Sequence, residues 1–130
     1  MEILERRVQE KMRDENGVTF LGNAFIKNFL LGALLLLLIG WGMLIYFIRP
    51  RETPLILHYN VYFGVDLLGT WWQAYVLQGV ASLLFLLHTA LGYSFYRKKE
   101  RFAADILLLA TTLSLFGVAG PSASIAFINY

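Results

Sequence analysis

The stretch at residues 29–48 reads FLLGALLLLLIGWGMLIYFI and decides the fold class. It has eight leucines and no charge, and its length is what an α-helix needs to cross a bilayer core of about 30 Å. At roughly −0.5 kcal/mol per leucine, leucine alone contributes about −4 kcal/mol to insertion. We therefore expect a permanent membrane anchor. A cleavable signal is not expected, because 28 residues with five acids precede the stretch and Arg49-Pro50-Arg51 follows it.

The composition of the whole chain agrees with this segment. Of its 130 residues 58% are hydrophobic and 15% are charged, and the mean hydropathy is +0.59, which excludes an ordinary soluble domain. The eleven Lys and Arg are balanced by nine acids and lie mostly beside apolar blocks, so nucleic acid is not an expected partner. The chain has no cysteine, which excludes disulfides, thiol catalysis and iron–sulfur clusters, and we expect no cofactor and no metal site.

Two further apolar blocks predict two more transmembrane helices. The second span, residues 72–96, begins at the Trp71-Trp72 pair and ends in aromatic residues beside a basic turn at 97–101. The third span, residues 102–120, precedes Pro121, which must break or kink the helix. The uncharged tail at 121–130 either lies in the outer interface or continues the third helix past a kink. We expect an all-α integral membrane protein with three transmembrane helices.

The distribution of basic residues predicts the orientation of these spans. Five Lys and Arg precede the first span, two lie in the loop at 49–71, four lie between 97 and 101, and none follows. By the positive-inside rule the N-terminus is cytoplasmic, while the loop at 49–71 and the C-terminus are external. The expected location is the cell membrane, as a multi-pass protein.

The N-terminal segment, residues 1–28, is expected to be a cytoplasmic amphipathic segment. Leu4, Val8 and Met12 recur every four residues among acid–base pairs, which indicates a short helix that ends at Asn16-Gly17. Two interpretations remain: the helix lies on the inner membrane surface, or it docks on the cytoplasmic face of a partner.

A stripe of polar and small residues runs along the second span at helical spacing. It should face protein and not lipid, and its polar members are Gln78, Ser82, His88 and Thr89. His88 lies roughly 13 Å from the cytoplasmic end of that span, where it needs a partner. The short turn makes the third span an antiparallel neighbour, so we predict a hydrogen bond from His88 to a hydroxyl of Thr111 or Thr112. Haem ligation or proton relay would need a second intramembrane histidine or carboxylate, which only a partner subunit could supply.

Asp105 lies one turn after Arg101 near the start of the third span. We interpret it as an acid that complements the helix N-terminus and pairs with Arg101.

The loop at 54–69 reads PLILHYNVYFGVDLLG and is too hydrophobic for an ordinary linker. Asn60 and Asp66 are good turn formers and Gly64 can take a positive φ, so we expect an ordered external loop. Its apolar residues should rest on the bilayer surface or cap the helix ends. His58, Asn60 and Asp66 are the candidate binding residues. These three residues are too few for a metal site, because further metal donors are missing. They are also weak evidence for a catalytic base with its orienting acid, because a nucleophile is missing.

The spacing in this loop resembles that of a domain at the N-terminal end of the SDP-toxin immunity type of bacterial membrane proteins. In that family the loop after the first span reads approximately Pro-x-His-aromatic-Asn-x-x-Gly-x-x-Asp-x-x-Gly. His58, Tyr59, Asn60, Asp66 and Gly69 match this spacing, whereas Gly64 is displaced by one position and the proline lies further upstream. The resemblance covers about 16 residues and the flanking spans, and the family usually has further spans. It implies a loop that binds or senses an extracellular peptide or forms an ordered lid.

These observations together predict a non-enzymatic bacterial membrane protein without catalytic residues. It acts as a binding, immunity-like or sensor module, or as an accessory subunit that packs against other membrane subunits or a second copy of itself. The alternative is an oligomeric transporter or channel lined by the polar stripe of the second span. A membrane enzyme that uses the His58 and Asp66 loop ranks third.

Overall fold

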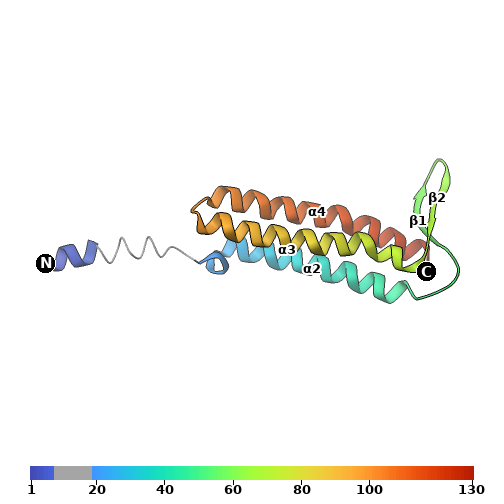
Figure 1. The fold of residues 1–130 in the computed structure, drawn as a ribbon, viewed down its shortest axis with the longest axis horizontal. Coiled ribbons are helices and arrows are strands. Elements are labelled where there is room, and N and C mark those ends of the chain that lie inside the picture. The colour runs from blue at the N-terminus through green and yellow to red at the C-terminus, as the bar shows by residue number, and fades with distance from the viewer. Residues whose placement is uncertain (8–18) are drawn as a thin grey trace.

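Three long helices form the body of the protein, and a β-hairpin stands at one end of them (Figure 1). The computed structural model describes residues 1–7 and 19–130. A 3-10 turn, η1 (Phe20–Gly22), leads into α2 (Ala24–Phe47). Strands β1 (Leu55–Asn60) and β2 (Gly64–Gly69) follow, then the 3-10 turn η2 (Trp71–Tyr75), α3 (Val76–Arg97) and α4 (Arg101–Ile128). Residues 2–7 are also helical.

All three long helices are long and apolar enough to cross a membrane, which fits a multi-pass membrane protein. No more than 22% of the most apolar window of each helix is buried inside the bundle. Most of the leucine-rich surface therefore faces outward, where a lipid environment satisfies it and water would not.

The first helix begins earlier than its apolar block. The side chain of Asn23 caps α2, because its Oδ1 accepts the backbone N–H groups of Phe25 at 3.0 Å and Ile26 at 3.4 Å. A cap of this kind satisfies N–H groups that have no partner within the helix, so α2 starts at Ala24 and not at residue 29.

The third helix passes through Pro121 and reaches Ile128. Of the two expectations for the tail, continuation of the helix is the one that the structure confirms. Proline removes a helical hydrogen bond, but packing holds the segment beyond it, because Ser122, Ile125 and Ala126 are buried against the bundle.

Helix α4 packs against both other helices and is the centre of the bundle. The buried residues form three groups along its length, around Phe20 and Leu108 at one end, Leu37 and Leu115 in the middle, and Leu44 and Leu55 at the other end. Leu55 belongs to β1, so the base of the hairpin is part of the core.

The expected ordered loop is a two-stranded antiparallel sheet, a structure that the sequence analysis did not predict. Leu55 pairs with Gly69 and Asn60 with Gly64, and the register shifts on either side of His58. Gly64 adopts φ = 78°, a conformation that side-chain-bearing residues seldom take, and so completes the turn. Of the N-terminal helix prediction, the structure describes the Arg6–Glu2 pair at 3.1 Å, whereas Val8, Met12 and Asn16-Gly17 lie outside the described residues.

Candidate functional site

The hairpin is fixed to the bundle through Asn129, the residue that follows α4. Its Oδ1 accepts the backbone N–H of Ile56 at 2.8 Å, and its Nδ2 donates to the carbonyl of Ile56 at 2.7 Å and to that of Ile125 at 2.9 Å. Arg51 donates to the backbone carbonyl of Asn129 at 3.3 Å. This clamp makes the hairpin a fixed extension of α4. Asn129 was not among the residues predicted from the sequence, although the single amide in the uncharged tail at 121–130 is a signal that points to it.

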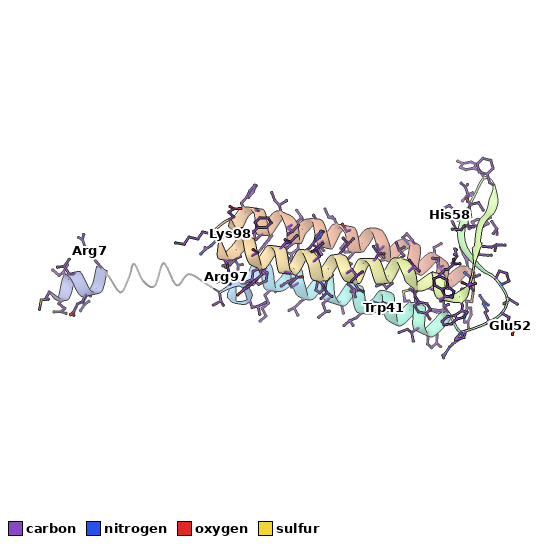
Figure 2. All side chains as sticks on the ribbon, in the orientation of Figure 1. Arg7, Trp41, Glu52, His58, Arg97 and Lys98 are labelled. Atoms are coloured by element: carbon purple, nitrogen blue, oxygen red, sulfur yellow. The ribbon has the colours of Figure 1, made fainter. Side chains whose placement is uncertain are left out.

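His58 and Asp66 meet across the two strands. The distance from His58 Nδ1 to Asp66 Oδ1 is 2.6 Å, and the two side chains are 61% and 42% exposed (Figure 2 labels His58). A carboxylate only accepts, so Nδ1 donates. Exposed pairs of this kind contribute about 0–1 kcal/mol to stability, because water competes for both partners. The pair therefore orients two side chains on an accessible surface more than it stabilises the hairpin.

Asn60, the third candidate binding residue, has its oxygen engaged within the turn. Its Oδ1 accepts the backbone N–H of Tyr62 at 2.9 Å, which is the hydrogen bond of an Asx turn. The structure thus brings His58 and Asp66 together and uses Asn60 to form the turn between them. Within residues 1–7 and 19–130 no group of three or more His, Cys, Asp or Glu side chains could hold a metal ion.

The apolar residues of the hairpin do not all do what the sequence predicts. Leu55 is buried and helps to close the end of the bundle, as expected. Val61, Tyr62 and Phe63 at the tip are 84%, 90% and 84% exposed, so the expectation that they cap the helix ends is wrong for them. The physical reason is the strand geometry, because a hairpin held at its base carries its tip away from the bundle.

Gln78 is the most buried member of the polar stripe, with 2% exposed surface. Its Nε2 donates to the carbonyl of Leu37 in α2 at 3.0 Å, and its Oε1 accepts from Ser122 Oγ in α4 at 3.2 Å. The side chain reaches α2 beside Gly40, where an added Cβ would lie 2.6 Å from the amide nitrogen. Gln78 therefore joins all three helices. Gly40 is one of the small residues of the first span that the sequence marks for close helix approach, whereas Ser122 was not singled out from the sequence.

Ser82 continues this network one turn along α3. Its Oγ donates to the carbonyl of Gln78 at 2.9 Å and accepts the indole N–H of Trp41 at 3.0 Å. Thr89 and Thr112 bond within their own helices, to the carbonyls of Phe85 at 2.7 Å and Leu108 at 3.0 Å. The hydroxyl protons of the stripe are thus used inside the chain.

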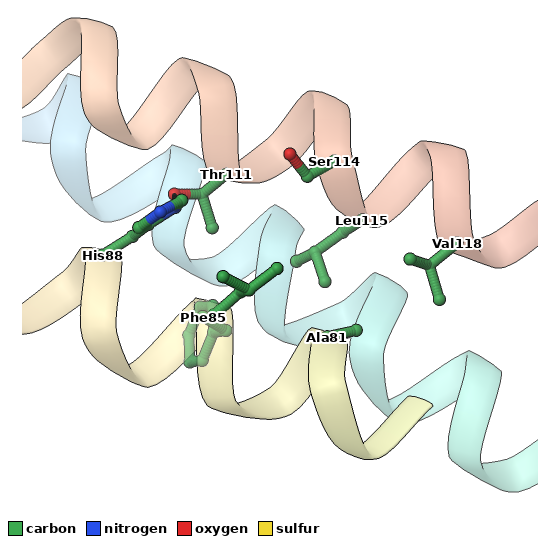
Figure 3. Close-up of a pocket in the computed structure, with 8 residues that line it drawn as sticks. Ala81, Phe85, His88, Thr111, Ser114, Leu115 and Val118 are labelled. Atoms are coloured by element: carbon green, nitrogen blue, oxygen red, sulfur yellow. Dashed lines mark hydrogen bonds between the residues drawn. The ribbon is translucent and has the colours of Figure 1, made fainter. Parts of the chain in front are cut away.

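The predicted His88 contact is confirmed: Nδ1 lies 2.9 Å from Thr111 Oγ1 (Figure 3). Thr111 donates its only hydroxyl proton to the carbonyl of Leu107 at 2.7 Å. His88 Nδ1 must then be the donor, which leaves Nε2 without a proton in the neutral ring. His88 lies in a shallow groove between α3 and α4, and α2 lies behind both helices in Figure 3. The residues that line the groove are Ala81, Leu84, Phe85, His88, Thr111, Ser114, Leu115 and Val118.

The interpretation of Asp105 as an ion-pair partner of Arg101 is wrong. The Arg101 guanidinium lies over the ring of Tyr96, 5.4 Å from its centroid. Asp105 falls beyond the first turn of α4, and its Oδ1 is buried with no hydrogen-bond partner in the described part of the chain. Arg101 has an aromatic face within reach, and this contact replaces the helical pair.

Comparison of the chain with protein-family models, with curated proteins and with solved structures finds no match.

Proposed function

We propose that the chain is a non-enzymatic protein of the bacterial cell membrane, with its N-terminus cytoplasmic and its hairpin and C-terminus external. It acts as a binding, immunity-like or sensor module, or as an accessory subunit of a membrane complex. The observation that carries the proposal is the construction of the hairpin. A linker between two spans needs neither a clamp such as Asn129 nor a stapled pair such as His58 and Asp66.

The proposed ligand is an extracellular peptide that meets the hairpin. Each strand of the sheet is paired on one side only. Asn129 occupies the backbone groups of Ile56 on the outer edge of β1, so the outer edge of β2 is the one that an extended peptide can pair with. His58 and Asp66 would supply side-chain contacts beside that edge. The resemblance of this loop to the SDP-toxin immunity type supports the same assignment.

The polar stripe supports an accessory or binding role over transport. A transport path needs polar groups that are free to face water or solute. In the bundle Gln78 is buried, and Ser82, His88 and Thr89 have hydrogen-bond partners within the chain. The stripe therefore contributes to helix packing. An oligomeric channel remains the alternative that the test below also addresses.

Site-specific photo-crosslinking in native cells tests the proposal. A crosslinking amino acid at Leu67, which is 52% exposed on β2, should capture an extracellular peptide or protein, and His58→Ala should abolish the capture. The matched position is Leu35, which is 60% exposed on α2 and should give lipid adducts only. Capture at Leu67 that is unchanged by His58→Ala, or no capture at all, would refute peptide binding. Crosslinking of Leu84 in the groove to another copy would favour the oligomeric channel.

A further inference from the structure

The tip of the hairpin is an uncovered apolar surface. Val61, Tyr62 and Phe63 expose 84%, 90% and 84% of their surface, and Val65, Leu67 and Leu68 behind them are 45%, 52% and 58% exposed. Scattered exposed apolar residues are normal, whereas a contiguous set at a projecting tip indicates contact with something apolar. Within residues 1–7 and 19–130 no side chain covers this surface.

The direction of the hairpin is set by its base. In Figure 1 the two strands run across the end of the bundle and not along the helices, and the tip points past the side of α4. Because Asn129 holds the backbone of Ile56 at both its N–H and its carbonyl, this direction is fixed relative to α4. In a bundle that spans a bilayer, such a hairpin runs along the membrane surface and not away from it.

The level of the hairpin is marked by an aromatic cluster at the same end. Phe47 packs on Phe127 at 5.4 Å and on Tyr130 at 5.3 Å between ring centroids, and Tyr46 packs on Phe47 at 4.9 Å. Tyr46, Phe127 and Tyr130 are 68%, 62% and 90% exposed. Exposed Tyr and Trp residues are enriched at the headgroup level of membrane proteins. Asn129 lies between Phe127 and Tyr130, so the hairpin leaves the bundle at this level.

We propose that the tip, Val61 to Phe63, is immersed in the outer headgroup region of the same bilayer that the helices span. The partner is a phospholipid surface, and the tip has no requirement for anionic lipid, because the hairpin at residues 55–69 contains no Lys or Arg and Arg51 at its base is bonded to Asn129. Burial of the aromatic and aliphatic tip drives the contact. The inference rests on the membrane insertion within the proposed function, and not on peptide binding.

Immersion of the tip would place His58 and Asp66 at the membrane surface, between the lipid-held tip and the clamped base. A peptide that partitions into the outer interface would then meet the pair without leaving the membrane. In this arrangement the apolar tip contacts lipid, and the polar pair is left to contact the peptide.

Single-cysteine labelling in the cysteine-free chain tests the inference. Phe63→Cys, labelled in detergent with a polarity-sensitive fluorophore, is reconstituted into phosphatidylcholine vesicles with and without headgroup-spin-labelled lipid. Neither Gly64 nor the Asn60 turn bond is altered by this change. We expect a blue-shifted emission and strong quenching relative to Glu52→Cys, an exposed position in the same loop. Val61→Cys is the second reporter, so that the result does not depend on one variant.

Leu35→Cys on the outward face of α2 separates the two ways in which the experiment can fail. If Leu35→Cys reports lipid while both tip labels report water, the tip inference is overturned and membrane insertion stands. If Leu35→Cys also reports water, insertion itself is refuted, and the inference falls with it. Tip protection that disappears when the protein is diluted to one chain per nanodisc would overturn the inference in favour of a second copy. Equal protection with and without phosphatidylglycerol would support it.

Discussion

The two histidines of the chain make the same bond in opposite surroundings. His88 donates through Nδ1 to Thr111 between two helices, at 2.9 Å, and His58 donates through Nδ1 to Asp66 on an exposed hairpin, at 2.6 Å. Thr111 is 2% exposed, so loss of the bond would leave a buried hydroxyl oxygen without its donor. On the hairpin water replaces either partner at little cost. The shorter bond is therefore expected to contribute less to folding, and its two side chains lie on an accessible surface.

The largest effect on stability is expected at Gly40, within the interior network. Gly40→Val would place a side chain against the Gln78 amide and break its bonds to Leu37 and Ser122. Overpacking of this kind costs about 1–3 kcal/mol. Gly32→Val is the matched control on the same helix, because nothing lies within 4 Å of a Cβ there. Unfolding in mixed micelles should separate the two variants, and equal stabilities would refute the close approach of Gln78.

A smaller, local effect on stability is expected at Asn129, which clamps the hairpin to the helix bundle. Asn129→Ala removes both partners of the Ile56 backbone, which should cost about 1–2 kcal/mol and free the hairpin while the helices stay folded. Hydrogen exchange should accelerate at Ile56 and the other amides of β1 and stay unchanged in the middle of α3. Asn28→Ala, in the first turns of α2, is the control. Global loss of protection would show that the clamp supports the whole bundle.

The sequence predicts the three helices because each depends on a local run of apolar residues. The hairpin was missed because its strands do not alternate: Leu55-Ile-Leu is continuously apolar on β1, and Leu67-Leu68 on β2, so the period of two that marks a half-buried strand is absent. The expected ordered loop still followed from its turn formers and glycines.

The residues that the sequence did not reveal act over long distances in the chain. Asn129 bonds Ile56, 73 residues away, and Ser122 bonds Gln78, 44 residues away. A lone amide or hydroxyl in an apolar segment does not specify its partner before the helices are placed. The His88 contact with Thr111 was predictable because one short turn joins the two helices. Residues at equal distances from that turn, on the two antiparallel helices, therefore lie side by side.

Substitution of His88, the histidine between the helices, is expected to lower the stability of the protein modestly. His88→Leu should cost about 0.6 kcal/mol, the average for measured interhelical hydrogen bonds in a membrane protein. A double-mutant cycle with Thr111→Val isolates this bond from the one that Thr111 makes to Leu107. A coupling energy near zero would refute the bond. Loss of a biological activity with folding intact would instead assign His88 a ligand or relay role.

Substitution of His58 or Asp66 on the exposed hairpin should have the smallest effect on stability and the largest effect on function. His58→Ala and Asp66→Ala should each change the free energy of unfolding by no more than about 0.5 kcal/mol, because both side chains are exposed. Either change should abolish the Leu67 crosslink, since it removes one half of the pair that we propose contacts the ligand. Leu35→Ala, on the outward face of α2, is the control and should leave the crosslink intact. If hydrogen exchange showed an unfolded hairpin in the His58 variant, the exposed pair would be structural. The reason to place recognition at His58 and Asp66 would then be lost.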